Sequence, residues 1–103
     1  ACIAGDMPKS AFTANSQAKV AAMKVRGELT QARVFPARYS NTCWSLLAPD
    51  DTVKVGGSYA AKDGKIGAVE TFVSQPNETP AQRKEQQAEN MGLYAGITKD
   101  IFG

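Results

Sequence analysis

A turn signal at Asp63-Gly64 constrains the fold of this chain more than any other feature. The dipeptide separates two runs that are rich in β-branched and aromatic residues, Thr52 to Ala61 and Lys65 to Val73. Asp-Gly favours a type I′ turn, in which both central residues take positive φ, because this turn matches the twist of two antiparallel strands. We therefore predict a β-hairpin, and Asn41 to Ala48 has the same composition and is predicted as a further strand.

Two helices are predicted to flank these strands. Between Ser10 and Arg26, small apolar residues recur at steps of three and four, which is the spacing of one face of a helix. This stripe comprises Ala11, Ala14, Ala18, Ala21 or Ala22, and Val25. Gly27 suits the position just past the end of this helix, and residues Glu28 to Ser40 are predicted to be a connecting segment. The run Thr79-Pro80-Ala81-Gln82 has the spacing of a capping box with proline at the first helical position, so a second helix should begin there.

The second helix is predicted to bury an apolar face and to expose a polar one. The apolar face comprises Ala88, Met91, Tyr94 or Ala95, Thr98 and Ile101. Residues Gln82 to Gln87 are all polar or charged and are predicted to be a solvated surface. Together these elements predict an α+β fold, with a small antiparallel sheet of about three strands, a long amino-terminal helix and a carboxyl-terminal helix.

Length and composition exclude several classes of protein. A chain of 103 residues is too short to divide its apolar groups between two cores, so a single domain over 1–103 is predicted. Its apolar stretches fall far below the roughly 18 residues of a membrane-spanning helix. The net charge of +2, without a cluster of Lys or Arg, gives no footprint for nucleic acid. The chain has no histidine and only two cysteines, which excludes Ser-His and Cys-His nucleophiles and leaves no metal site predicted.

Cys43 is the most informative of the reactive side chains in the sequence. It lies at the start of a predicted strand, beside Trp44, the only tryptophan. A thiol in this position could be a buried packing group, half of a structural disulfide with Cys2, or a redox centre. These alternatives stay open on the residues alone.

The residues before the first helix carry two further candidate motifs. Gly5-Asp6 is similar to the Gly-Asp pair that holds the ribityl chain of many flavins, but an ordinary turn before a helix is favoured. Met7-Pro8-Lys9-Ser10 leads into the helix, whose free N–H groups and dipole suit an electron-rich carbonyl or an anionic ring. A capped helix that binds nothing explains the same residues.

Several blocks of the sequence resemble the flavoprotein subunit of flavocytochrome c sulfide dehydrogenase. In the family's order, the blocks are Ala1 to Ala4, Met7 to Phe12, Ala14 to Lys19, Asn41 to Pro49, Val55 to Tyr59 and Asp100 to Gly103. The resemblance implies that the chain is the carboxyl-terminal part of a larger FAD-dependent subunit of the disulfide-reductase type. Residues 1–27 would end its FAD domain, and residues 41–103 would form a domain that covers the flavin.

The resemblance also implies roles for individual residues. Met7, Pro8, Lys9 and Ser10 match the helix start that faces the pyrimidine edge of the isoalloxazine. Cys43 matches one half of the family's redox-active disulfide, with its partner in a preceding part of the subunit, and Cys2 would not be catalytic. Gly5-Asp6 would not be the ribityl-binding pair, since the family places that pair immediately before Ala1.

The implied function is the oxidation of sulfide in the bacterial periplasm. Sulfide attacks the disulfide, the released thiolate passes electrons to FAD, and the reduced flavin hands them singly to a c-type haem on a cytochrome subunit. We expect the isolated chain to bind FAD weakly or not at all, to show no turnover, and to self-associate through exposed apolar surface. The alternatives are a non-catalytic interaction or dimerisation module, and a homologue that binds but has lost turnover.

Overall fold

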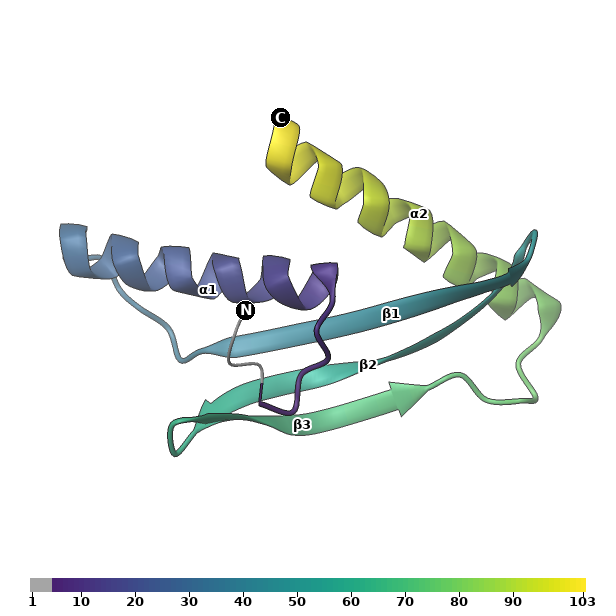
Figure 1. Cartoon of the computed structure of the whole chain (residues 1–103), viewed down its shortest axis with the longest axis horizontal. Coiled ribbons are helices and arrows are strands. Elements are labelled where there is room, and N and C mark those ends of the chain that lie inside the picture. The colour runs from purple at the N-terminus through teal and green to yellow at the C-terminus, as the bar shows by residue number, and fades with distance from the viewer. Residues whose placement is uncertain (1–4) are drawn as a thin grey trace. The chain divides into compact units, whose positions relative to one another are not determined.

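The computed structural model of the chain describes residues 5–103 as two helices and a three-stranded antiparallel sheet (Figure 1). The elements are α1 (Ala11–Thr30), β1 (Arg38–Ala48), β2 (Asp51–Lys62), β3 (Lys65–Val73) and α2 (Pro80–Phe102). The strand order is β1-β2-β3, so each strand pairs with its neighbour in sequence. The predicted α+β class and both terminal helices are confirmed. No helix within the described part of the chain has the length and apolar character needed to cross a membrane.

The hairpin between β2 and β3 forms at the predicted dipeptide. Asp63 and Gly64 both have positive φ, 52° and 76°, as a type I′ turn requires. β3 has the predicted bounds, whereas β1 begins at Arg38 rather than Asn41. Local turn chemistry therefore determines this part of the sheet.

The start of α2 is the predicted capping box. The Thr79 hydroxyl accepts a hydrogen bond from the N–H of Gln82 at 3.2 Å, and the Gln82 side chain accepts one from the N–H of Thr79 at 2.7 Å. Pro80 occupies the first helical turn, where its missing N–H costs nothing. All the residues that make this cap lie within one turn of helix.

The end of α1 was wrongly predicted. The helix continues through Gly27 to Thr30, and it ends at Gln31, which takes a left-handed conformation with φ of 61°. A side chain at Gly27 would overlap Val34, which folds back against the helix. Gly27 therefore permits a close approach of the connector and does not stop the helix.

The chain divides into two compact units, and the division crosses all three strands. One unit consists of the residues up to Asn41 together with Gly57–Thr71, and we name it the α1 unit. The other consists of Thr42–Gly56 and Phe72–Gly103, and we name it the α2 unit. Each unit is described by itself.

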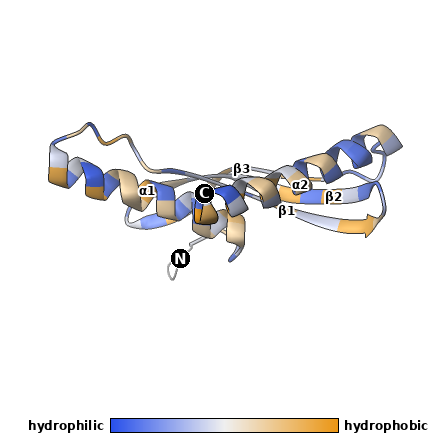
Figure 2. Ribbon diagram, turned by 90° about the horizontal axis from the view of Figure 1, so that it is seen from above, coloured by the Kyte–Doolittle hydropathy of each residue, from blue (hydrophilic) through white to orange (hydrophobic). Residues whose placement is uncertain are grey.

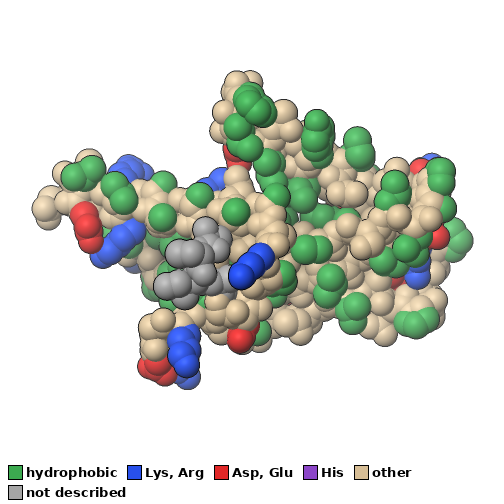
Figure 3. All heavy atoms as spheres, in the orientation of Figure 1, with side chains coloured by type: hydrophobic (Ala, Val, Ile, Leu, Met, Phe, Trp, Pro, Cys, Tyr) green, Lys and Arg blue, Asp and Glu red, His purple; other side chains and the backbone are tan. Residues whose placement is uncertain are grey.

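The α1 unit has a small apolar core. Met7 and Tyr59 are buried, with 3% and 5% of their surfaces exposed, and Tyr39 and Ile66 pack against them. The alanine stripe predicted on α1 does not take part, because its members are exposed to solvent. Figure 3 shows hydrophobic side chains at the molecular surface along both helices.

The faces of α2 differ from the prediction. Met91, Tyr94 and Ile101 of the predicted apolar face are 60%, 71% and 64% exposed, while Gln86 of the predicted solvated surface is buried. Hydrophobic and hydrophilic residues are mixed along the helix (Figure 2). The helix packs through polar side chains because hydrogen bonds and ion pairs satisfy them there, which a pattern of hydropathy does not register.

Candidate functional site

The residues predicted to bind a cofactor at the start of α1 fall into two kinds. The side chain of Met7 lies in the core, where its sulfur accepts a weak hydrogen bond from the Gln17 amide at 3.6 Å. Pro8 and Lys9 are exposed. Only the exposed pair has a side chain available to an external group.

Ser10 acts as the cap of α1 and ties the helix to the sheet. Its hydroxyl accepts a hydrogen bond from the N–H of Thr13 at 3.1 Å and donates one to Oδ1 of Asn41 at 2.6 Å. Asn41 is only 1% exposed, so this bond is shielded from water. The Ser10 side chain is fully used in holding the helix start on β1.

The start of α1 suits a contact with the edge of a flavin, but it is no complete binding site. The N–H of Ala11 opens the helix and has no acceptor within it, and the positive end of the helix dipole lies there. Pro8 and Lys9 precede this N–H in sequence and are open to solvent. These groups fit an electron-rich ring edge, whereas Met7 and Ser10 contribute through structure.

Gly5 and Asp6 form a turn that docks on β3. The N–H of Asp6 donates to the carbonyl of Ile66 at 3.0 Å, and the Asp6 carboxylate accepts from the N–H of Ala68 at 3.1 Å. Gly5 has a φ of 58°, and a side chain at this position would overlap Ile66. The carboxylate thus has a structural role, which confirms the prediction of a turn.

Cys43, the predicted catalytic residue, lines a hollow of about 250 Å³ in the α2 unit. The hollow is lined by Cys43, Ser45, Val53, Lys54, Val55, Val73 and Ser74. Cys43 is half-buried, and its neighbours in the hollow include three valines from β2 and β3. The thiol therefore lies at a small, largely apolar surface.

The alternation of side chains along the strands places Cys43 and the three valines of this hollow on one face of the sheet. Trp44, Lys54 and Ser74 each bond to a residue of α2 through their side chains. Successive side chains of a strand point to opposite faces, so the neighbours of these three residues point away from α2. Cys43 and the valines of the hollow are such neighbours. The thiol accordingly lies on the face of the α2 unit that its helix leaves uncovered.

Glu89 of α2 holds the residues next to Cys43. Its carboxylate accepts a hydrogen bond from the Trp44 indole at 3.2 Å and forms an ion pair with Lys54 at 2.7 Å. The hydrogen bond from Lys54 is the main cause that lowers the pKa of Glu89, and the bond from Trp44 acts in the same direction, while burial opposes both. The Lys54 ammonium also lies 5.9 Å from the ring centre of Phe72. β1, β2 and α2 are joined at this carboxylate.

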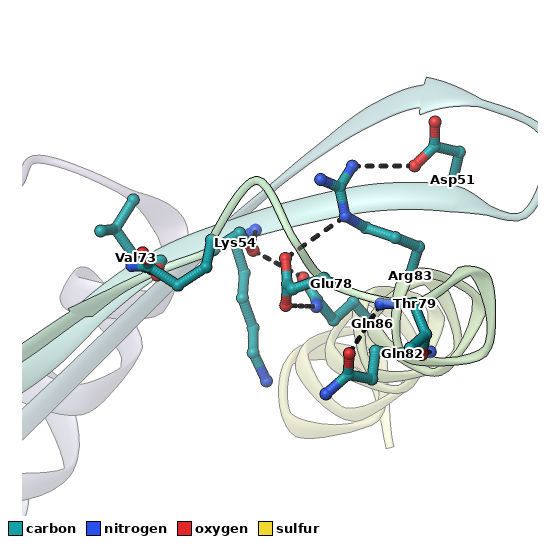
Figure 4. A network of polar contacts seen from close by, with 10 residues as sticks. Asp51, Lys54, Val73, Glu78, Thr79, Gln82, Arg83 and Gln86 are labelled. Atoms are coloured by element: carbon teal, nitrogen blue, oxygen red, sulfur yellow. Dashed lines mark hydrogen bonds and ion pairs between the residues drawn. The ribbon is translucent and has the colours of Figure 1, made fainter.

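A chain of partly buried hydrogen bonds continues from β2 to the start of α2 (Figure 4). The N–H of Lys54 donates to the Ser74 hydroxyl at 2.8 Å, and this hydroxyl donates to the Gln86 side chain at 2.9 Å. The Gln86 amide in turn donates to the carboxylate of Glu78. Gln86 therefore has both ends of its amide satisfied, which explains its burial in a helix of polar sequence.

Arg83 closes this polar network. It lies 3.3 Å from the Glu78 carboxylate and 3.1 Å from that of Asp51, so one guanidinium bridges two acids (Figure 4). The Arg83 and Glu78 side chains are mostly buried, whereas Asp51 is partly exposed. The bridge fixes the first turns of α2 against the hairpin of β1 and β2.

The residues of the network were missed by the sequence reasoning. Lys54, Gln86 and Glu89 lie in segments whose local pattern indicates an ordinary strand and a solvated helix surface. The only local signal was the placement of Trp44, a large side chain with one donor, next to Cys43. An indole that packs against a helix needs an acceptor there.

Two sequence expectations concern residues or sites that lie outside these contacts. Cys2 lies outside the described residues, so its pairing with Cys43 stays a prediction. Within residues 5–103, no group of three or more Cys, Asp or Glu side chains could hold a metal ion.

Comparison with known protein families finds a flavin-binding family over most of the chain. The model described as "Flavocytochrome c sulphide dehydrogenase, flavin-binding" matches residues 35–102, which is more than half of the chain. The matched range includes all three strands and the whole of α2. It therefore contains the hollow of Cys43 and the polar network, and it begins after α1.

Proposed function

Because the chain belongs to the family of flavin-binding domains of flavocytochrome c sulphide dehydrogenase, we propose that it covers the flavin of a sulfide-oxidising subunit. The family makes the protein part of a flavin-dependent oxidoreductase. We propose that the flavin is FAD, that the electron acceptor is a c-type cytochrome subunit, and that the location is the periplasm. Residues 1–27 then complete the FAD domain, and residues 41–103 form the covering domain.

The observation that carries this proposal is the position of Cys43 on an uncovered face. Its hollow of about 250 Å³ has room for a small sulfur species. Val55 and Val73, which line the same hollow, are half or more exposed, so apolar surface surrounds the thiol. Such a surface is suited to burial against another domain and a flat ring system.

The proposed chemistry at Cys43 is thiol-disulfide exchange. Cys43 forms a disulfide with a second cysteine that another part of the subunit supplies. Hydrosulfide attacks one sulfur, a new S–S bond forms at that sulfur, the original S–S bond breaks, and the second sulfur leaves as a thiolate. The sulfur of sulfide is oxidised and the disulfide is reduced. FAD, when bound, supplies an acceptor for the electron pair.

The described residues support this reaction by fixing the strands beside the thiol within the α2 unit. Glu89 holds Trp44, the residue next to Cys43, and Lys54 on the neighbouring strand. A strand anchored at neighbouring residues gives its cysteine a defined position, which thiol exchange needs because the three sulfur atoms must align.

The proposal is tested by Cys43→Ser in the complete flavoprotein subunit. Serine retains the size of the side chain but cannot form a disulfide. We expect the sulfide-dependent loss of the flavin's visible absorbance to fall to background, while the bound flavin content stays the same. Ser58→Ala, on an exposed part of β2, is the control and should behave like the wild type. Undiminished flavin reduction in Cys43→Ser would refute the redox role of this thiol.

A second candidate function is a non-catalytic interaction module. The exposed apolar side chains along α2 favour it. If Cys43→Ser has no effect on flavin reduction, this function replaces the first.

A further inference from the structure

We propose that the outward face of α2 binds the same face of a second copy of this chain, with the two helices antiparallel and crossing at Gly92. This inference goes beyond the proposed function and does not depend on Cys43. It starts from two glycines, Gly92 and Gly96, in the middle of a 23-residue helix. Neither has the positive φ that favours glycine, and a side chain added at either would meet no atom within 4 Å.

Glycine in a helix interior is destabilising relative to alanine, so its presence there needs a reason. Within the described chain, Gly27 and Gly57 have one, because a side chain at either would overlap a neighbouring segment. Gly92 and Gly96 have no such neighbour. Their spacing of four residues is that of a helix pair in which two backbones approach closely. The missing neighbour is therefore a helix from outside this chain.

The surroundings of the glycines form a surface suited to such a helix. Ala88 lies four residues before Gly92, so three small residues follow one another along the same stripe. Met91 and Phe102 lie on one side of the stripe and are 60% and 82% exposed. The stripe lies about a third of a turn around α2 from the buried Gln86, and its three residues are exposed. Small residues allow a close approach, and the large apolar side chains add buried area at one edge of the stripe.

The charges on this face select a second copy as the occupant. Glu85 lies seven residues before Gly92 and Lys99 lies seven residues after it, and both are exposed. An antiparallel crossing at Gly92 brings Glu85 of one copy to Lys99 of the other, and the two-fold axis repeats the pair. Within one helix the two residues are about 21 Å apart, at 1.5 Å per residue, so they cannot pair there. The sequence is thus complementary to itself about this glycine.

Charge reversal tests the pairing directly. We expect the chain to dimerise with a concentration-dependent mass in analytical ultracentrifugation. Glu85→Lys and Lys99→Glu each place like charges together twice, and each should weaken the dimer by about tenfold or more. The double variant E85K/K99E restores opposite charges and should recover the wild-type dissociation constant. Lys65→Glu, exposed at the start of β3, is the control for net charge and should leave the dimer unchanged.

Steric substitution tests the crossing point. Gly92→Leu adds a side chain where the single chain has open space and replaces a poor helix former, so the melting temperature of the dilute monomer should rise. In the dimer the same side chain separates the two backbones, and association should weaken by about tenfold or more. The melting curve shows whether Gly92→Leu is folded, so that a loss of association cannot be attributed to unfolding.

Three results would overturn the proposal. A strict monomer at high concentration excludes the interface. A dimer that tolerates Gly92→Leu and both charge reversals assigns association to another face of the chain. Failure of E85K/K99E to recover the affinity, with a folded protein, shows that Glu85 and Lys99 do not meet and that the antiparallel crossing at Gly92 is wrong.

Discussion

Each of the two compact units of the chain is stabilised internally by a different kind of interaction. The α1 unit buries two hydrophobic side chains, Met7 and Tyr59, in one cluster, in addition to the polar Thr13 and Asn41. In the described part of the α2 unit, the buried side chains are polar, and ion pairs and hydrogen bonds join the helix to the strands. Apolar burial depends on volume and is insensitive to pH, whereas a charged network depends on both partners of each bond. The two units should therefore fail under different substitutions.

The largest effect is expected from the apolar core. Met7→Ala removes most of a buried side chain and leaves a cavity beside Tyr59, so the free energy of unfolding should fall by about 2–5 kcal/mol. Urea denaturation followed by circular dichroism measures this. Met91→Ala, on the exposed face of α2, is the matched control and should change stability by about 0.5 kcal/mol or less in dilute protein. Equal effects of the two variants on the free energy of unfolding would show that burial of Met7 in the core does not stabilise the chain.

A smaller effect is expected from the centre of the polar network. Gln86→Leu retains bulk but removes the amide that joins Ser74 to Glu78, and both partners lose a hydrogen bond. Stability should fall by about 1–3 kcal/mol, because a buried polar group without a partner keeps its cost of desolvation.

The control for Gln86→Leu lies on the same helix. Lys84→Leu alters an exposed residue two positions earlier and should have little effect in urea denaturation. A stabilising effect of Gln86→Leu would mean that apolar packing at this helix surface is stronger than the polar network.

The smallest effect is expected at Glu89, whose side chain is 37% exposed. Its pKa in the folded chain is lowered from the ordinary value of 4.5, chiefly by the hydrogen bond from Lys54. A lowered pKa gives stability that is present above the ordinary value and is lost as the pH falls through the lowered value. Wild-type protein should lose this increment on acidification, and Glu89→Gln should not.

The fluorescence of Trp44 should report the protonation of Glu89, because Trp44 is the only tryptophan in the sequence and its indole bonds to Glu89. In the wild type, its fluorescence should shift as the pH falls below 4.5, before global unfolding. Glu89→Gln should show no such step. A step of the same size in both proteins would assign the titration to another group.

Elements that depend on neighbouring residues could be predicted from the sequence. The Asp63-Gly64 turn and the Thr79 capping box are made by residues within four positions of each other, and both are confirmed. Gly27 was predicted to lie just past the end of α1. Its role depends on Val34, which returns against the helix from the following connector and which the local sequence does not place there.

The candidate site could be predicted only in part. Cys43 was singled out from the sequence, and the structure places its half-buried side chain at a hollow of the α2 unit. The hollow around it depends on how the strands pair and on which face of them α2 covers. Both are features of the tertiary structure, which a local sequence pattern does not give. Polar burial at Gln86 also could not be foreseen, because its partners lie on Ser74 and Glu78, outside the helix.

The docking of Asp6 on β3 has a consequence for the order in which the chain folds. The bond from Ala68 to the Asp6 carboxylate spans 62 residues, so it closes a loop of more than half the chain. Closing such a loop costs entropy that local elements do not require, and contacts of this kind form slowly. During synthesis Gly5 and Asp6 leave the ribosome before β2 and β3 do, yet the surface on which they dock exists only after the β2–β3 hairpin has formed. This turn is therefore made before its docking surface, and its contacts with β3 are among the last to form.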